Sequence, residues 1–550
     1  MRERSHGARG GVGSRESARE SVVDRALAAY GGARDARTGA YIGGARADAA
    51  LATYARDDTR DARATKRATN GLAFARSVDA TARELAGFGA RNAVVALGIE
   101  CSETFLRYWL ACAQCGACAA PLNGRWDAAE AAEAARDAGA EVVILDDAHD
   151  ARWSKAGFRD VGIVVFDASP EEGSGDEDEG WTKAYRRRAD DACAMCYTSG
   201  TSGSPKAVML SHGSVCAATR AKLEVVGYDA GDTYLHVAPL YHVGGLSSAH
   251  ATLAAGANHV FVNKFDPDLV LRIIVDEGVT AFIAVPAMMR ELVDSRGGDT
   301  VFPTVRKILV GAGRLTDELY NSIRHVFPNA KVTMAYGMTE TTSSVTFLSP
   351  EDARFELDAD STFAGNAAPG VEVKTDAEGQ LLVRGSSLML GYVGVDRTET
   401  FDADGWFATG DLGAVGEARG EETGSRVWLR GRAKEMIKSG GENVSPEEVE
   451  RILNKHANVE ASVVIGAPHT KWGEAVVAIV KLRATASDTE AEHRTALRDW
   501  CAKSELARFK IPKCFVFTED LRSNAMGKLM RDATYRANVL AIEHAVSRVR

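Results

Sequence analysis

The sequence predicts an α/β protein with a large N-terminal domain and a small, mobile α+β C-terminal domain. At 550 residues the chain is too long for one ordinary domain. Short β-branched segments alternate with helical periods after about residue 90, a pattern typical of layered, mainly parallel sheets and helices. After residue 365 the strands become shorter and are separated by glycine turns, which predicts a β-rich subdomain within the large domain.

The expected elements follow from these patterns. Ala/Arg-rich amphipathic segments reach to about residue 90. We expect buried strands at Val94–Ile99, Val142–Leu145, Ile163–Phe166, Ala281–Val285 and Lys307–Val310. We expect helices at Phe105–Cys115, Ala128–Ala138 and Leu269–Glu277, and antiparallel hairpins built from Val371–Lys374, Leu381–Arg384 and Val427–Leu429. A helix from Pro446 to Lys455, capped by Ser445, and a strand at Ser462–Ile465 are expected near the end.

Three segments result. Residues 1–20 are rich in Arg, Gly and Ser and are expected to be a disordered or targeting segment. Residues 21–431 form the large domain, and residues 432–550 form the small domain, with a hinge near Lys434.

Composition argues against two classes of partner. The formal net charge of −10 disfavours a nucleic-acid-binding body, which usually shows a basic face. The longest apolar stretch, near Leu106–Leu122, contains Arg107 and is shorter than the ~20 residues of a membrane span, so no span is expected. The first residues lack the apolar region of a secretory signal. We expect an intracellular protein, with chloroplast and peroxisome both left open.

Nine cysteines include two spacings that metal sites use, at Cys112, Cys115 and Cys118 and at Cys193 and Cys196. The first group lies in an alanine-rich apolar pattern that predicts one helix, where free cysteine behaves as a small core residue. We therefore expect structural thiols in a reducing compartment rather than a metal site.

The strongest functional signal is the segment from Tyr197 to Lys206, which is rich in glycine and hydroxyl side chains. Its backbone N–H groups and hydroxyls suit an anion, and its two glycines permit close approach. Lys206 follows a proline, so the segment is not a Walker P-loop. The sequence predicts a phosphate-binding loop built from Thr198, Ser199, Gly200, Thr201, Ser202, Gly203 and Lys206.

This loop resembles that of the adenylate-forming enzymes, the superfamily of acyl-CoA synthetases, luciferases and adenylation domains. Further motifs resemble the same superfamily in the expected order, from about residue 90 to the end. The motif ending in His242 is similar to one that lines the acyl and pantetheine channel. Gly311 and Gly313 resemble a turn that lies against adenine.

The segment Tyr336-Gly337-Met338-Thr339-Glu340 resembles the superfamily's adenylate motif. The resemblance implies that Tyr336 and Gly337 lie against the nucleotide, that Thr339 contacts phosphate and that Glu340 holds Mg²⁺. Mg²⁺ prefers such hard oxygen ligands. The motif follows an expected strand at Lys331–Ala335, and strand carboxyl ends are where α/β sheets place ligands.

The remaining motifs fall near the domain boundary and the end of the chain. The resemblance makes Asp411 the ribose ligand, Arg432 a nucleotide contact and Lys434 the hinge. It places Gly440 and Gly441 in a loop that enters the site for thioester formation. Lys528 resembles the mobile lysine that bridges the substrate carboxylate and the α-phosphate. Ala207 and Ala312 stand where the superfamily usually has glycine, which leaves only local loop geometry in question.

The resemblance therefore implies an acid–thiol ligase that uses ATP, Mg²⁺ and coenzyme A as co-substrate on a small-molecule carboxylic acid. The acid first forms an acyl-adenylate, and the coenzyme A thiol then displaces AMP. Lys528, Glu340, Thr339 and His242 are the expected catalytic residues.

Several segments look similar to the o-succinylbenzoate–CoA ligases of plants and algae, which act in phylloquinone and menaquinone biosynthesis. They are Tyr234–Ala249, Phe282–Met289, Val305–Leu309 and Phe509–Lys513. A fatty-acyl, aryl or malonyl-CoA synthetase is the alternative. A luciferase-type oxygenase, a carrier-protein adenylation module and a non-catalytic nucleotide sensor of the same fold are weaker alternatives.

Overall fold

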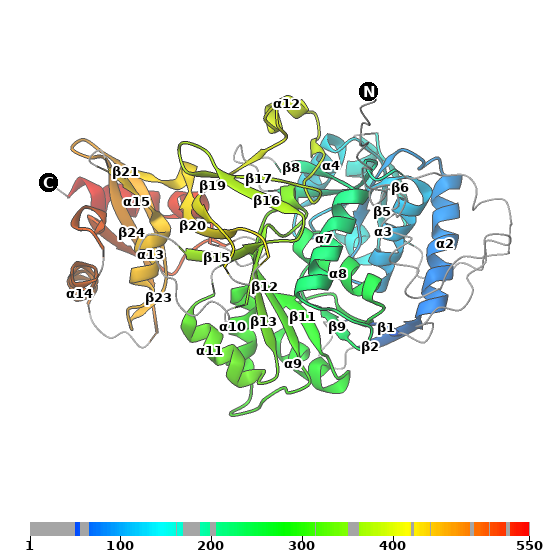
Figure 1. Cartoon of the computed structure of the whole chain (residues 1–550), viewed down its shortest axis with the longest axis horizontal. Helices are drawn as coiled ribbons and strands as arrows, with labels where there is room; N and C mark the ends of the chain where they lie inside the picture. The colour runs from blue at the N-terminus through cyan, green and yellow to red at the C-terminus, as the bar shows by residue number, and fades with distance from the viewer. Residues whose placement is uncertain are drawn as a thin grey trace, which may run out of the picture.

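The computed structural model describes residues 50–55, 65–153, 155–160, 162–168, 188–198, 205–313, 315–349, 362–419, 423–439, 442–484, 489–504, 506–523 and 529–548. The segment 1–20 lies outside these residues. The described strands form three sheets of thirteen, seven and five strands. Figure 1 shows the elements of the five-stranded sheet, coloured orange to red, at one end of the molecule.

The seven-stranded sheet is mostly parallel, with an antiparallel edge at β7, β8 and β18. Its order is β18 (Gly391–Tyr392), β8 (Lys206–Ser211), β7 (Ala192–Thr198), β4 (Cys118–Pro121), β3 (Val94–Gly98), β5 (Ala140–Leu145) and β6 (Val164–Asp167). Helices α2 (Gly71–Gly87) and α3 (Glu103–Cys115) pack into its core cluster, and α4 (Ala128–Asp137) contributes Ala131, Ala132 and Ala135 to a second one.

The thirteen-stranded sheet has a parallel part and an antiparallel part. The parallel part runs β13 (Lys331–Tyr336), β12 (Lys307–Gly311), β11 (Ala281–Ala284), β9 (Thr233–His236), β10 (Asn258–Val262) and β1 (Ala50–Ala55), with β2 (Thr65–Asn70) antiparallel at its edge. The antiparallel part runs β14 (Thr346–Leu348), β15 (Thr362–Ala367), β20 (Arg426–Arg432), β19 (Phe407–Gly416), β17 (Gln380–Gly385) and β16 (Val371–Thr375). The expected hairpins are present, and they extend the parallel sheet rather than form a separate one.

Two helices form a layer between these sheets. Helix α7 (His212–Val225) packs along α8 (Val243–Ala255). Leu246, Ala249 and Leu253 of α8 join the core cluster that contains α3 and β3, whereas Ala221 and Ala251 join residues of β9, β11 and β12. Figure 1 shows both helices between the two groups of strands. Helices α9 (Pro267–Asp276), α10 (Pro286–Ser295) and α11 (Asp317–Val326) contribute to the core cluster of the parallel part.

The third sheet contains β22 (Glu442–Val444), β21 (Ile437–Ser439), β24 (Gly473–Leu482) and β23 (Val459–His469), with β25 (Cys514–Phe517) paired to β24. Helices α13 (Pro446–Leu453) and α14 (Glu490–Lys503) cover its core, and α15 (Arg531–Ser547) contacts β23 and β25. The Ser445 side chain caps α13, accepting from Glu448 N as expected from the sequence. The α/β fold class is confirmed, and apart from the helix pattern extended to Cys118, the strands and helices proposed from periodicity after residue 90 are present.

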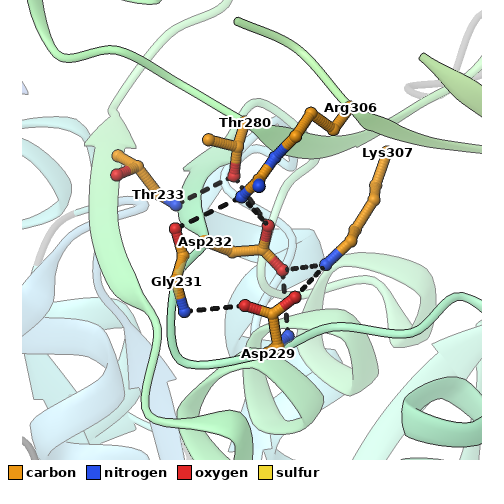
Figure 2. A network of polar contacts seen from close by, with 7 residues as sticks. All are labelled: Asp229, Gly231, Asp232, Thr233, Thr280, Arg306 and Lys307. Atoms are coloured by element: carbon orange, nitrogen blue, oxygen red, sulfur yellow. Dashed lines mark hydrogen bonds and ion pairs between the residues drawn. The ribbon is translucent and has the colours of Figure 1, made fainter. Parts of the chain in front are cut away.

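A polar network closes the amino ends of three parallel strands (Figure 2). Asp232, fully buried before β9, accepts hydrogen bonds from Thr280 Oγ1 (2.8 Å) and Asp229 N (2.9 Å). It pairs with Lys307 Nζ at 2.6 Å and Arg306 Nη2 at 3.3 Å, at the start of β12. Functional side chains are therefore expected at the opposite, carboxyl edge of this sheet.

The cysteines need one correction. Cys112 and Cys115 lie in α3, but the helix ends there, Gly116 caps it with φ 85°, and Cys118 begins β4. The expected single helix across Cys112–Cys118 is therefore wrong. All nine thiols are free and eight are buried. Among the described residues, no group of three or more His, Cys, Asp or Glu side chains is arranged to hold a metal ion. Over the same residues, no helix is both long enough and apolar enough for a membrane span.

Candidate functional site

The carboxyl edge of the parallel part carries the predicted nucleotide residues. Strand β12 ends at Gly311, and Ala312 has a φ of 62°, the left-handed conformation that usually favours glycine. Strand β13 ends at Tyr336, and Gly337 leads into a 3₁₀ turn, η4 (Thr339–Thr341). These loops lie on adjacent strands, because β12 pairs with β13.

The loop after β13 is closed tightly. A Cβ on Gly337 would lie 1.9 Å from the carbonyl oxygen of Ser343, so only glycine fits there. Thr342 and Ser343 have φ values of 50° and 97°, which cost free energy in residues other than glycine. The bond from Val345 N to Tyr336 O (2.7 Å) and the bond from Thr342 Oγ1 to Ser387 O (2.7 Å) hold this geometry. Such retained strain is typical of binding sites.

Asp411 lies at the centre of one polar cluster. Tyr336 donates its hydroxyl to Asp411 Oδ2 at 2.6 Å, and Arg432 Nε lies 2.7 Å from Oδ1. The pairing of β19 with β20 places Asp411 opposite Arg432. Burial and the neighbouring carboxylate raise the pKa of Tyr336 well above its ordinary value. Three residues predicted from separate motifs are thus brought together.

Glu340 has a neighbour that the sequence did not point to. Tyr392, in β18, donates its hydroxyl to Glu340 Oε1 at 2.8 Å. Burial, followed by the Glu340 charge, raises the pKa of Tyr392. Lys206 Nζ lies 5.5 Å from the centre of the same ring. Tyr392 was missed because it lies 52 residues from Glu340 in sequence and no local motif marks it.

We expect Tyr392→Phe to slow acyl-adenylate formation about tenfold and to raise the Mg²⁺ concentration needed for half-maximal rate. The phenylalanine keeps the ring but leaves Glu340 without the hydroxyl that orients it. Pyrophosphate release at varied Mg²⁺ concentration measures both effects. Tyr535→Phe in α15 is the matched control and should leave both values unchanged. An unaltered Mg²⁺ requirement in Tyr392→Phe would contradict a positioning role.

His242 stands at the start of α8 without capping the helix. Its Nε2 is buried and has no hydrogen-bond partner among the described residues. Burial, with a smaller effect from Arg125, lowers the pKa of His242 to about 4. The imidazole is therefore neutral near pH 7, which suits a channel for uncharged groups.

The turn that carries Lys434, the predicted hinge residue, is connected to the start of α15. Lys434 is exposed in the 3₁₀ turn η5 (Ala433–Glu435). The neighbouring Glu435 pairs with Arg531, which also pairs with Glu450 (2.8 Å) and Glu447 (3.0 Å) of α13. Burial raises the pKa of Glu450 to about 7, although Arg531 opposes this shift. The start of α15 is thus bound to the turn that carries Lys434.

The predicted phosphate-binding segment is described only at its ends. The described part of the chain includes Thr198 and Lys206, which pair across β7 and β8 and flank the phosphate-binding segment. The residues that lie outside the described residues are Ser199, Gly200, Thr201, Ser202, Gly203, Gly440, Gly441 and Lys528.

Comparison with known proteins gives consistent results. Residues 57–393 match the family described as AMP-binding enzyme, and residues 448–528 match the AMP-binding enzyme C-terminal domain. The chain is 34% identical to the chloroplastic/peroxisomal 2-succinylbenzoate–CoA ligase of Arabidopsis thaliana, over 86% of this chain and 92% of that protein. It is 31% identical to indoleacetate–CoA ligase of Aromatoleum aromaticum, over 82% of this chain and 89% of that protein.

Comparison with solved structures points to the same family. ATP-bound MatB from Rhodopseudomonas palustris matches with a TM-score of 0.76 and 27% identity, over 94% of this chain and 99% of that one. The o-succinylbenzoate CoA synthetase of Bacillus subtilis, in complex with its acyl-adenylate intermediate, matches with a TM-score of 0.73 and 26% identity, over 88% and 94% of the chains. The resemblance seen in the motifs is confirmed, and the chain belongs to the AMP-binding enzyme family.

Proposed function

We propose that this protein is an ATP-dependent acid–CoA ligase that activates 2-succinylbenzoate. The acid–CoA ligase class rests on family membership and on relatives that are CoA ligases. The choice of acid rests on one observation, the 34% identity to a plant 2-succinylbenzoate–CoA ligase over most of both chains. This ligase would serve phylloquinone or menaquinone biosynthesis.

The site residues suit the nucleotide. A carboxylate can accept both hydrogen bonds of a ribose diol, so Asp411 is the ribose ligand and Arg432 holds its orientation. Tyr336, whose hydroxyl is fixed by Asp411, presents its ring to adenine beside the Gly311–Gly313 turn. Thr339 and the segment from Thr198 to Lys206 are the proposed phosphate ligands.

Glu340 fits a magnesium ion. It is half-buried, and Tyr392 holds Oε1, while Oε2 has no partner among the described residues. An oxygen of this kind, together with substrate phosphates, is a common Mg²⁺ environment. When bound there, Mg²⁺ offsets phosphate charge.

The reaction requires one anion to attack another. The substrate carboxylate attacks the α-phosphate of ATP, and pyrophosphate leaves. Lys528 and the N–H groups of the phosphate loop reduce the repulsion and stabilise the charge that develops. We further propose that residues 432–550 then rotate about Lys434, so that Lys528 leaves and Gly440 and Gly441 enter. The coenzyme A thiol attacks the acyl carbon beside His242, and AMP leaves.

A substrate panel tests this function. With ATP, Mg²⁺ and coenzyme A, we expect kcat/KM for 2-succinylbenzoate to exceed that for indole-3-acetate, malonate or palmitate by about a hundredfold or more. Turnover of another acid alone would refute the choice of substrate but keep the ligase. If no acid releases pyrophosphate, the ligase itself is wrong and the nucleotide-sensor alternative gains support.

The Arabidopsis relative is named as chloroplastic/peroxisomal. We propose one of these compartments for this protein as well. Immunolocalisation of the untagged protein with plastid and peroxisome markers tests this proposal. A signal confined to the cytosol would refute it.

A further inference from the structure

One lysine is buried against α8 and the loop after β13, without an acidic partner among the described residues. Lys222 lies on α7, between the two large sheets, and is only 1% exposed. Its ammonium group donates to Ser247 Oγ of α8 and to Ser343 Oγ at 2.9 Å. Within the described residues, no carboxylate lies within ion-pair distance of Lys222 Nζ.

This arrangement is costly for the protein alone. An ammonium group has three donors, and the two serine hydroxyls accept only two of them. A buried cation without a counter-charge is destabilising, whereas a methionine of similar length would pack there without that penalty. Burial lowers the pKa of Lys222 to about 7, which reflects the lack of a neighbouring anion.

The two serines connect Lys222 to the functional site. Ser343 follows Glu340 by three residues, has the strained φ of 97°, and accepts a hydrogen bond from Lys222 Nζ at 2.9 Å. Ser247 lies in the first turns of α8, which begins directly after His242. Lys222 therefore links the two segments that carry the proposed magnesium ligand and the proposed channel residue.

2-Succinylbenzoate has a chemical feature that requires such a group. It carries two carboxylates, one on the succinyl arm that is activated and one on the aromatic ring. The ring carboxylate must leave water when the acid binds, and an unpaired buried carboxylate is as costly as an unpaired buried ammonium. A pair of the two satisfies both groups.

We propose that Lys222 binds the ring carboxylate of the acid substrate, assisted by Ser247 and Ser343. This inference rests on the proposed function and names the residue that selects a dicarboxylate. Each serine accepts a hydrogen bond from Lys222. The hydroxyl proton of each serine is then available to donate to the carboxylate. A monoacid would leave the lysine unpaired and is rejected for that reason.

Other titratable groups on the packed elements are engaged elsewhere. His250 of α8 bonds Thr219 of α7 through Nδ1 at 2.6 Å, and Glu340 bonds Tyr392. Tyr336, at the start of the loop that carries Ser343, bonds Asp411. Among the described residues of these elements, Lys222 is thus a buried cation without a carboxylate partner.

A matched pair of acids tests the proposal. 4-Oxo-4-phenylbutanoate has the same succinyl arm as 2-succinylbenzoate but lacks the ring carboxylate. We expect the wild-type protein to favour the dicarboxylate by about a hundredfold in kcat/KM, measured by pyrophosphate release. Lys222→Met should lower that preference at least about tenfold, mainly by lowering kcat/KM for the dicarboxylate. Arg220→Met, which removes an exposed cation from the same helix, should keep the full preference.

The outcomes separate the two claims. If Lys222→Met lowers kcat/KM for both acids by the same factor, the lysine is structural and the inference is wrong. The proposed function then stands. If the wild-type protein uses a different acid, the proposed substrate is wrong. The inference then holds only if that acid has a second carboxylate and if Lys222→Met removes the preference in kcat/KM for this acid over its analogue that lacks that carboxylate.

A second measurement does not depend on the variant folding. Burial lowers the pKa of Lys222 to about 7, and pairing with a carboxylate raises that pKa, so binding above this pH should take up protons. Calorimetric titration of wild-type protein with 2-succinylbenzoate, without ATP, in buffers of different ionisation enthalpy measures this uptake. Binding of the monoacid should take up no proton. Binding of the dicarboxylate without proton uptake would overturn the inference.

Discussion

Lys528→Ala should slow acyl-adenylate formation by about a thousandfold, while thioester formation from supplied acyl-adenylate changes less than about threefold. The lysine is proposed to act only in the first half-reaction, where two anions must meet. In the second half-reaction it has left the site, so its removal should cost little.

The described residues that flank Lys528 contact other parts of the small domain. Ser523 and Leu529 form an antiparallel bridge on either side of the segment 524–528. Arg531, two residues after Leu529, is bound to Glu435, Glu447 and Glu450. The described residues on either side of 524–528 are therefore held within the small domain.

Pyrophosphate release measures the first step, and thioester formation from synthetic acyl-adenylate measures the second. Lys455→Ala, at an exposed position of the same domain, should leave both steps unchanged. Equal losses in both half-reactions would contradict the proposed alternation between two domain positions. If Lys528→Ala forms the acyl-adenylate at the wild-type rate, the proposed mechanism is wrong.

Asp232→Ala should lower the free energy of unfolding by about 3–5 kcal/mol. The fully buried carboxylate is paired with Lys307 at 2.6 Å and accepts from Thr280 and Asp229 N (Figure 2). Its loss leaves the partly buried Lys307 without its buried partner and leaves the Thr280 hydroxyl without its acceptor, at the amino ends of β9, β11 and β12. KM values should not change, because the proposed nucleotide residues lie at the carboxyl edge.

Asp229→Ala provides a graded control, since Asp229 pairs with the same lysine at 2.6 Å but has a side chain that is 59% exposed. Exposed pairs contribute little, so we expect a loss below about 1 kcal/mol. Chemical denaturation of both variants, compared in midpoint and slope, measures the difference. Similar losses for the two variants would show that burial of Asp232 is not what makes the network stabilising.

The sequence predicted most of what local patterns determine. Buried strands such as β3, β11 and β12 and capped helices such as α13 follow from side-chain periodicity and capping residues. Strands β1 and β2 were missed, because alanine- and arginine-rich segments carry little strand signal. The joining of the hairpins to the parallel sheet was also missed, since strand pairing depends on contacts far apart in sequence.

The same limit applies to the site. Motifs pointed to Tyr336, Asp411 and Arg432 one at a time, and the structure places them in one hydrogen-bonded cluster. Tyr392 and Lys222 carry no motif of their own. They gain their significance from partners 52 and 121 residues away, namely Glu340 and Ser343.

The buried cysteines have a consequence for an enzyme whose co-substrate is itself a thiol. Burial raises the pKa of Cys118 and Cys196 to about 12 and that of Cys501 and Cys514 to about 11. Only a thiolate exchanges with a disulfide, so these side chains stay inert toward oxidised coenzyme A. These four thiols are therefore protected from forming a mixed disulfide with the co-substrate.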